Sequence, residues 1–278
     1  ISHINILLYL SSLIYRKPKY IGREANVRSE RRKMNTKKNK LADLLHDRSL
    51  SKLDAVVCQS QDMLNDFKTY RSINTSNFVV INNPITDGFL LKSKTDPSKP
   101  IKYITVGALH IRKGHERLLN MLAKVDHKFE YTIIGDGPEA TKIDALINEL
   151  NLDSFVKRIS HTQDVASYLS AHDVFLNGSF VEGFPNVMLE SCATGTPVVS
   201  FEAPGGINEI IRDGENGYIV NSEAAYLSTL NSVNSSYPFH KEQVRTSVTS
   251  RFSKSVILSA YETMLKSLHS KSANVCRF

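Results

Sequence analysis

The sequence lacks tryptophan altogether and has three cysteines among its 278 residues. Cys58, Cys192 and Cys276 are odd in number and far apart, a pattern that is not typical of a disulfide framework or of a zinc site. A reducing compartment is the simplest setting for such a chain, so we expect a cytoplasmic protein.

Long hydrophobic runs are also lacking. The longest apolar run near the N-terminus, residues 4–14, is interrupted by Asn5, Ser11 and Ser12 and is shorter than the roughly 20 residues that span a bilayer. It has neither the preceding basic segment nor the following small-residue cleavage site of a signal peptide. Because the chain starts with Ile1 rather than methionine, inside a predicted helix, we expect that N-terminal sequence is missing.

The overall composition is that of a soluble globular protein, with 41% hydrophobic and 23% charged residues. Such a chain can bury a sizeable core. Its length suits one large domain or two small ones, at roughly 100–200 residues each.

Positive charge is in excess, with a formal net charge of +7, and much of it lies in segment 28–40. The basic residues there are Arg28, Arg31, Arg32, Lys33, Lys37, Lys38 and Lys40. This segment is either a solvated helix face or a surface for anionic lipid headgroups, at about 1 kcal/mol per basic residue near a membrane. Nucleic acid is disfavoured, because neither a nucleic-acid motif nor interleaved aromatic residues accompany the charge.

From residue 100 on, short segments rich in Val and Ile alternate with helical segments. The predicted strands are 102–106, 131–134, 156–159, 173–176, 197–201 and 217–220. The predicted helices are 115–124, 139–150, 165–170, 186–194 and 207–212. This alternation predicts an α/β Rossmann-like domain, in which helices cover a parallel sheet and ligands bind at the carboxyl ends of the strands.

Before residue 90, predicted strands and helices alternate in the same way, but there are fewer of them. The predicted helices are 4–14, 29–50 and 61–71, and the predicted strands are 20–22, 55–58 and 78–81. These are too few strands for a complete α/β domain and look like its second half. We therefore predict an incomplete Rossmann-like domain at 1–91, a linker at 92–100, a complete one at 101–250, and a tail at 251–278. The tail contains an amphipathic helix, 253–268, that packs back on the domains.

Glycine and polar residues follow the predicted strands at one edge of the second sheet. In the first loop, Gly107 allows a tight turn, and Arg112 and Lys113 stand just before a helix, where phosphate is favoured. Adjacent cations at a helix start are also common surface residues. The second loop contains Gly135 and Gly137 and is either a ligand contact or simply a good strand-to-helix turn.

The third loop runs from Glu182 to Glu190, with Asn186 beginning a helix whose free backbone amides would face a cleft. Two carboxylates at this spacing suit a ligand with many hydroxyl groups. The alternative is that Glu190 is a satisfied buried acid and Glu182 a loop charge. In the fourth loop, Gly205 and Gly206 precede a helix and form either a diphosphate contact or a structural turn.

Taken together and in this order, these motifs resemble the C-terminal domain of the retaining glycosyltransferase family 4, which has the GT-B fold. The resemblance covers about residues 100 to 220. It rests on the turn at Lys113-Gly114, the loop 135–137, the strand 173–176, the E-x7-E motif from Glu182 to Glu190, the run CATGTPVV at 192–199 and the glycines at 205, 206 and 214. Segments 23–26 and 81–84 resemble relatives that build bacterial surface polysaccharides. A Rossmann oxidoreductase is disfavoured, since no G-x-G-x-x-G fingerprint follows an early strand.

The resemblance implies two Rossmann-like domains that face a cleft, the first of them incomplete and on the acceptor side. It implies transfer of a sugar, with retention of configuration, from a UDP- or GDP-linked donor to a saccharide or lipid-linked acceptor. Lys113, helped by Arg112, would neutralise the donor diphosphate as the glycosidic bond breaks. Glu182 would contact the donor sugar and Glu190 the ribose hydroxyls.

The other donor contacts that the resemblance implies are Gly107, Gly135, Gly137, Phe184, Pro185, Asn186 and Val187. Neither a metal nor another cofactor is expected, and the sequence has no Asp-x-Asp cluster. The protein would lie in the cytoplasm, where segment 28–40 would hold it at the inner face of the membrane.

One departure and three alternatives stay open. Ala108 stands where many relatives carry an arginine directly after the glycine of the first loop, and we expect Arg112 to compensate. The alternatives are a sugar-nucleotide epimerase of the same fold, a glycogen-type phosphorylase, for which no specific lysine motif is seen, and a non-catalytic fragment that binds nucleotide or polyanion.

Overall fold

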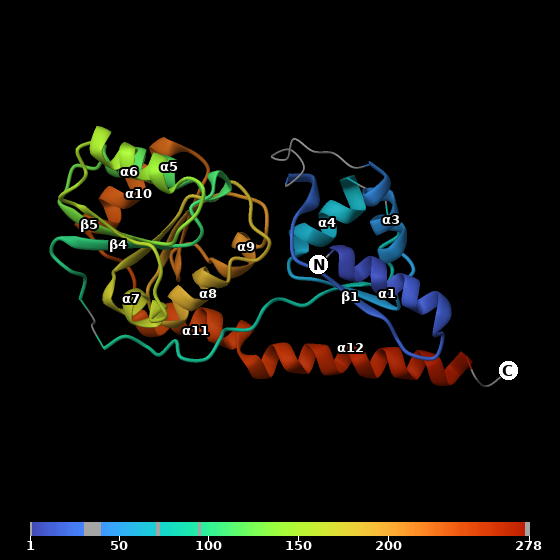
Figure 1. The fold of residues 1–278 in the computed structure, drawn as a ribbon. Helices are drawn as coiled ribbons and strands as arrows, with labels where there is room; N and C mark the ends of the chain where they lie inside the picture. The colour runs from blue at the N-terminus through green and yellow to red at the C-terminus, as the bar shows by residue number, and fades with distance from the viewer. Residues whose placement is uncertain (1, 31–39, 71–72, 94–95, 276–278) are drawn as a thin grey trace.

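The structure is a computed structural model that describes residues 2–30, 40–70, 73–93 and 96–275. It forms two α/β units that lie side by side, a first unit of residues 2–83 and a second unit of residues 101–252, and a C-terminal helix crosses from the second toward the first (Figure 1). The main buried cluster fills the second unit and extends into the first through Ala55, Val57 and Ile81.

The second unit is built on a six-stranded parallel sheet. Its strands are β4 (Ile101–Val106), β5 (Phe129–Ile134), β6 (Val156–Ile159), β7 (Val174–Asn177), β8 (Val198–Phe201) and β9 (Gly217–Val220). Their order in the sheet is β6-β5-β4-β7-β8-β9, so the chain reverses its direction of travel between β4 and β7. Ligands of open α/β sheets bind at the carboxyl ends of the strands at this reversal, which puts the loops after β4 and β7 at the expected site.

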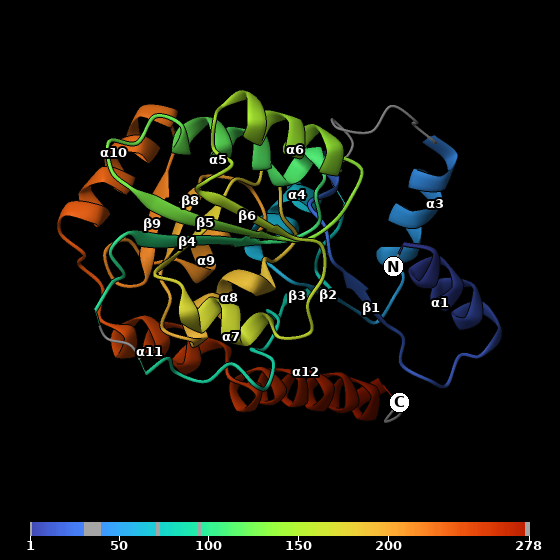
Figure 2. The ribbon, with the colours of Figure 1, turned by 60° about the vertical axis from the view of Figure 1, so that its left-hand side comes forward.

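Helices cover both faces of this sheet, as Figure 2 shows. One face carries α5 (His115–Leu122), α6 (Ala140–Glu149) and α10 (Glu223–Ser235). The other carries α7 (Val165–Ala171), α8 (Asn186–Ala193) and α11 (Lys241–Phe252), and the short α9 (Ile207–Ile210) precedes β9. All six predicted strands and all five predicted helices of this unit are confirmed, with ends that differ by one or two residues. Helices α10 and α11 were not predicted.

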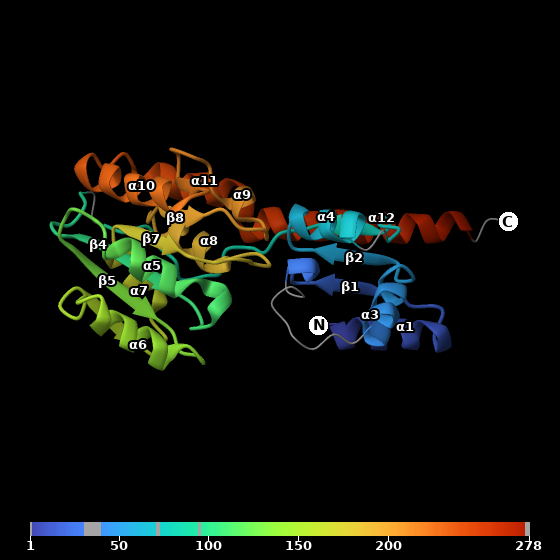
Figure 3. The ribbon, with the colours of Figure 1, turned by 90° about the horizontal axis from the view of Figure 1, so that it is seen from above.

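The first unit has a three-stranded parallel sheet in the order β1-β2-β3, formed by β1 (Ile21–Glu24), β2 (Ala55–Cys58) and β3 (Phe78–Val80). Helices α1 (Ser2–Ile14) and α3 (Lys40–Leu50) lie on one face and α4 (Gln61–Tyr70) on the other (Figure 3). The predicted long helix 29–50 is helical at both described ends, and residues 31–39, which carry most of its basic side chains, lie outside the described residues.

Two segments connect the units or extend from them. The predicted linker 92–100 belongs to no helix or strand in its described residues, and Lys92 at its start is buried and donates to the His172 carbonyl and to Thr196. The C-terminal helix α12 (Lys254–Val275) packs through one stripe, with Ile257 and Met264 buried. Val256 and Leu265 lie beside that stripe and are exposed, because packing on one side of a helix repeats every three to four residues.

In the described part of the chain, no helix combines the length and the apolar composition that crossing a bilayer requires.

Candidate active site

The side chains of Lys113 and Glu182 meet at the carboxyl edge of the second sheet. Lys113 ends the short 3-10 helix η1 (Ile111–Lys113) after β4, and Gly114 then takes a left-handed conformation with φ of 62°. The Lys113 Nζ lies 2.6 Å from the Glu182 Oε1, and the side chains are 18% and 6% exposed. Arg112 lies at the edge of this pair, with its guanidinium 4.0 Å from the other carboxylate oxygen. Two of the predicted loops therefore do converge, and the Lys113 side chain stays partly accessible to solvent.

Glu182 is held in place by a chain of buried hydroxyl and amide groups. The Ser179 hydroxyl lies 2.5 Å from the Glu182 Oε1 and 3.0 Å from the Asn177 Oδ1. The Asn177 amide donates in turn to the Ser200 hydroxyl at 2.9 Å. All four side chains are buried. A carboxylate fixed by such a network has one orientation, which is what recognition of a sugar hydroxyl needs.

The predicted glycines of the first two loops are required where the loops touch each other. A Cβ on Gly135 would lie 2.0 Å from the Gly107 carbonyl oxygen, and a Cβ on Gly137 would lie 2.4 Å from the Leu109 carbonyl oxygen. Both Gly135 and Gly137 also have positive φ. These two glycines let the loops pack backbone to backbone at the sheet edge.

The start of helix α8 presents the backbone groups of the third loop. Pro185 occupies the N-cap position, and no side chain among the described residues caps this helix through a hydrogen bond. The Phe184 ring is buried against Phe252, with the ring centroids 5.8 Å apart. What Phe184 can offer a ligand is therefore its backbone, whereas Asn186 and Val187 begin the helix at the cleft.

Asn186 is also bound from the first unit, and Glu190 from the segment that connects the two units. The Asn83 amide donates to the Asn186 Oδ1 at 2.7 Å, and Arg23 donates to the Asn83 Oδ1 at 2.5 Å. The Thr86 hydroxyl donates to the Glu190 carboxylate at 3.0 Å. Burial raises the pKa of Glu190, and the hydrogen bond from Thr86 offsets part of this rise. The third loop thus belongs to a boundary between the units.

The fourth loop also lies at the boundary between the two units. The Asp62 carboxylate accepts from the backbone amides of Gly205 and Gly206 at 2.9 and 3.1 Å. In the opposite direction, Glu209 accepts from the Gln61 amide at 2.6 Å and from the Asn82 side chain at 2.8 Å. The structure thus favours the structural alternative for Gly205 and Gly206, because a protein carboxylate already holds the amides that a diphosphate would need.

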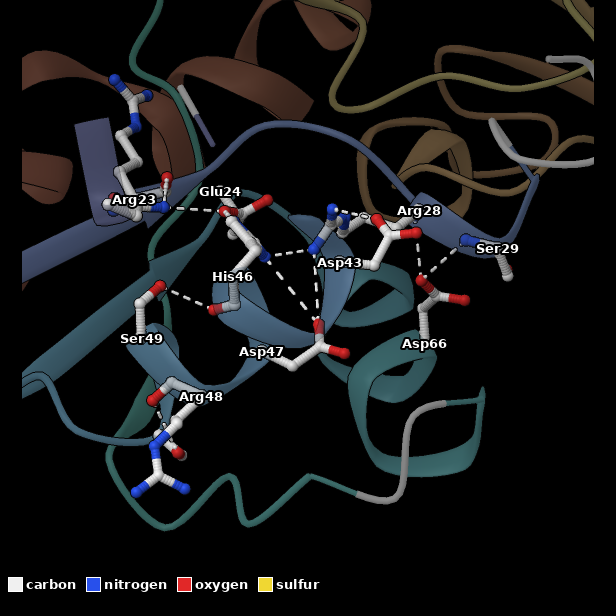
Figure 4. Close-up of polar contacts among 12 residues, drawn as sticks. Arg23, Glu24, Arg28, Ser29, Asp43, His46, Asp47, Arg48, Ser49 and Asp66 are labelled. Carbon is white, nitrogen blue, oxygen red and sulfur yellow. Dashed lines mark hydrogen bonds and ion pairs between the residues drawn. The ribbon is translucent and has the colours of Figure 1, made fainter. Parts of the chain in front are cut away.

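The first unit contains a buried polar network, shown in Figure 4. The Glu24 Oε1 is 2.8 Å from the His46 ring and 2.7 Å from the Asn5 amide. The Arg28 guanidinium pairs with Asp43 and Asp47 at 3.1 and 3.4 Å. Arg28 was predicted to contribute to a basic surface, but its charge is neutralised by acidic residues of the same unit.

Among the described residues, no group of three or more His, Cys, Asp or Glu side chains is arranged to hold a metal ion. The two cysteines in this part of the chain, Cys58 and Cys192, are free and buried. Independence of metal stays a prediction.

A family model described as glycosyl transferases group 1 matches residues 89–244, which is more than half of the chain. The chain belongs to this family. The matched range contains Arg112, Lys113, Glu182 and Glu190 and all of the second sheet.

Three curated relatives that the chain resembles over part of their length come from bacteria. An uncharacterized glycosyltransferase of Haemophilus influenzae is 31% identical over 52% of this chain and 41% of its own. The lipopolysaccharide core biosynthesis glycosyltransferase LpsE of Rhizobium meliloti is 31% identical over 60% of this chain and 49% of its own. A Campylobacter jejuni N-acetylgalactosaminyltransferase, whose name specifies a diphospho-undecaprenol substrate, is 29% identical over 61% and 47%. The chain spans about half the length of these relatives.

Solved structures of similar fold cover both units. Anabaena Alr3699/HepE, in complex with UDP, superposes with a TM-score of 0.83 at 19% identity, over 96% of this chain and 77% of that one. The lipopolysaccharide outer core galactosyltransferase WaaB gives a TM-score of 0.73 at 20% identity, over 94% and 79%. The expected α/β GT-B fold class is confirmed by the parallel sheets and by these likenesses.

The sequence did not reveal several residues that build this site. Ser179 and Asn177 hold Glu182, and Thr86 holds Glu190. Their hydroxyl and amide groups sit next to predicted strand ends, which is the signal that could have found Asn177 and Ser179. Thr86 carries no such signal, since its partner is 104 residues away.

Proposed function

We propose that this chain transfers a sugar from a nucleotide-sugar donor to a saccharide or lipid-linked acceptor, with retention of configuration, as a member of glycosyltransferase family 4. The observation that carries the proposal is the Lys113–Glu182 pair at the β4–β7 reversal, a buried carboxylate beside a partly exposed cation, in a chain of the group 1 family. A cation and a carboxylate side by side suit a ligand that carries both a diphosphate and a sugar.

Lys113 would bind the donor diphosphate and stabilise the negative charge that grows on it as the glycosidic bond breaks. Its partner Glu182 is also held by Ser179, so Lys113 can exchange the carboxylate for a phosphate without leaving Glu182 unpaired. Arg112, at 4.0 Å from Glu182, would add a second cation on the diphosphate. Preorganised charges of this kind lower the barrier because they need no rearrangement during the reaction.

The rest of the donor would lie along α8. Glu182 would accept hydrogen bonds from the sugar, Glu190 from the ribose, and the backbone at Phe184–Val187 would hold phosphate or sugar oxygens. Backbone groups at Gly107, Gly135 and Gly137 would border the nucleotide. In a retaining reaction, the leaving diphosphate would take the proton of the attacking acceptor hydroxyl on the same face of the sugar.

A role in bacterial surface-polysaccharide synthesis is supported by the names of the relatives, which act in lipopolysaccharide synthesis or on diphospho-undecaprenol. The donor is proposed to be UDP- or GDP-linked, and one similar structure holds UDP. We further propose a cytoplasmic location, with the chain held at the anionic inner leaflet through segment 28–40. Arg28 is excluded from that surface by its own ion pairs.

The proposal is tested by incubating the chain with UDP- and GDP-sugars and following the anomeric proton by NMR, with Lys113→Ala as the negative control. Transfer to an acceptor or to water, with the anomeric configuration of the donor kept and the rate lost in the variant, is expected. Inversion of the configuration would contradict the assignment to a retaining family. Conversion of the donor to its epimer, with no acceptor required, would favour the epimerase instead.

A further inference from the structure

Arg117, in the first turn of α5, reaches across to the loop that follows β7. Its Nε and one terminal nitrogen each donate a hydrogen bond of 2.5 Å, the first to the Gly178 carbonyl and the second to the Ser179 carbonyl. Gly178 and Ser179 lie four and three residues before Glu182, in the same loop. The two nitrogens of a planar guanidinium can hold two successive carbonyls at a fixed spacing, which an ammonium group cannot do.

The same guanidinium is enclosed by two aromatic rings. Its central carbon lies 4.1 Å from the ring centroid of Phe180 and 3.9 Å from that of Phe201. Burial lowers the pKa of Arg117 to about 10, so the group still carries its charge at neutral pH. Cation–π contact strengthens when the cation is removed from water, and the rings also prevent the side chain from leaving its carbonyl partners.

The loop that Arg117 grips is also the one that touches the Lys113 turn. The Phe180 amide donates to the Arg112 carbonyl at 2.8 Å. A Cβ on Gly114 would lie 1.9 Å from the Gly178 carbonyl oxygen, so the two backbones are in direct contact. The loop carrying Glu182 and the turn carrying Lys113 therefore form one body, and Arg117 ties that body to helix α5.

We propose that Arg117 is a positioning residue for Glu182. By holding the Gly178 and Ser179 carbonyls it places the sugar-binding carboxylate relative to Lys113, and Lys113 itself stays in place just before the start of α5. The role of the Lys113–Glu182 pair in donor binding rests on the proposed function. Arg117 itself faces the aromatic rings and the loop backbone, and its effect on the donor is transmitted through residues 178–182. The nucleotide end of the donor, assigned to Glu190 on α8, should be independent of Arg117.

The test compares Arg117→Lys with a matched control, Arg251→Lys. Arg251 also donates to two successive carbonyls, those of Glu209 and Ile210, and lies against a phenylalanine ring, but far from residues 178–182 in the chain. The first readout is hydrogen exchange of the ligand-free chain. Loss of two charge-assisted hydrogen bonds should make the Phe180 and Glu182 amides exchange about tenfold faster in Arg117→Lys and leave them unchanged in Arg251→Lys.

The second readout compares the affinity for UDP or GDP with that for the corresponding UDP- or GDP-hexose that binds the wild-type chain most tightly. In Arg117→Lys the affinity for the nucleoside diphosphate should stay within about twofold, and the extra affinity that the hexose provides should be lost. A purely structural defect would weaken both ligands together. Conservative replacement of the contact rings, Phe180→Tyr, should leave both affinities near the wild-type values.

Unchanged exchange at Phe180 and Glu182 in Arg117→Lys would overturn the proposal, as would equally faster exchange throughout the second unit. Equal weakening of nucleoside diphosphate and nucleotide sugar would overturn it too. If the wild-type chain bound no nucleotide sugar, the proposed function would fail, but the exchange measurement would still decide whether Arg117 positions the loop.

Discussion

Both units of the molecule bury a glutamate, but the partners of Glu182 and Glu24 differ in how open they are to solvent. In the second unit the partner of Glu182 is Lys113, whose side chain keeps 18% of its surface exposed at the cleft. In the first unit the partner of Glu24 is His46, which is 1% exposed. A partly exposed cation can exchange its carboxylate for a ligand phosphate, whereas a sealed pair cannot. The two buried glutamates thus differ in whether a ligand can reach their partner.

An exposed ion pair of the same length serves as a reference for the Lys113–Glu182 pair. Lys142 and Glu116 lie 2.6 Å apart, the same distance as Lys113 and Glu182, but their side chains are 59% and 52% exposed. Surface pairs contribute little to stability. The distance between two charges therefore says less about function than the position of the pair relative to the cleft.

The largest expected effect is that of Lys113→Ala. Removing the cation that offsets charge on the leaving diphosphate should lower the rate of sugar transfer or donor hydrolysis by about a hundredfold to a thousandfold. Steady-state kinetics with saturating donor measures it. Lys142→Ala is the matched control and should keep the wild-type rate. A similar loss in both variants would mean that the buried pair has no special role.

Glu24→Ala, in the first unit, is expected to lower the stability of the fold. It leaves His46 and Asn5 without the acceptor they share, so the free energy of unfolding of this unit should fall by about 2–4 kcal/mol. Chemical denaturation followed by hydrogen exchange of the β1 and β2 amides measures the change. Glu24→Gln keeps an acceptor oxygen and should lose less than half as much. Equal loss in the two variants would show that the charge, and not the hydrogen bonding, stabilises the unit.

Asp62 and Asp66 allow contacts between the units to be distinguished from contacts within one unit. Asp62 caps the Gly205 and Gly206 amides across the boundary, whereas Asp66 caps the Arg28 and Ser29 amides inside the first unit. Asp62→Ala should expand the molecule in small-angle scattering, since hydrogen bonds to a charged group are worth about 1.5–3 kcal/mol each. Asp66→Ala should lower the melting temperature without that expansion. Identical scattering profiles for Asp62→Ala and the wild type would refute the role of this contact.

The smallest effect concerns Glu190, whose pKa is raised by burial from its ordinary value of 4.5. A raised pKa means that the folded state holds the proton more tightly, so this group lowers stability as pH rises from about 4.5 through the raised value. Glu190→Gln removes that cost and should raise Tm by about 2 °C at pH 7.5 and by less at pH 4. The same change should weaken nucleotide binding about tenfold, because an amide is a poorer acceptor for ribose hydroxyls.

A Glu190→Gln variant that melts below the wild type at pH 7.5 would contradict the prediction that the buried Glu190 carboxylate lowers stability at this pH. Differential scanning calorimetry at the two pH values measures it, and Glu149→Gln, on the end of α6, serves as a control for changing a carboxylate to an amide.

Much of the second unit was predictable because parallel strands buried on both faces are short runs rich in β-branched and aromatic residues, such as those at 131–134 and 198–201. Helices α10 and α11 escaped prediction because residues such as Tyr226, Leu230 and Val248, which bury their inner faces, are spaced among Ser, Thr and Asn residues. Strand ends located Lys113 and Glu182. What spacing could not supply was the contact of Thr86 and Asn83 with α8, because it depends on how the two units lie against each other.

The Lys113–Glu182 edge and helix α8 are proposed to bind a nucleotide sugar. This binding is tested most directly by calorimetry with a panel of nucleotide sugars on the wild-type chain and on the Lys113→Ala, Glu190→Ala double variant. We predict that one or two UDP- or GDP-linked sugars bind the wild type and that this binding is lost in the double variant, which should remain folded. A folded wild-type chain that binds none of them, or a double variant that binds them equally well, would contradict the claim.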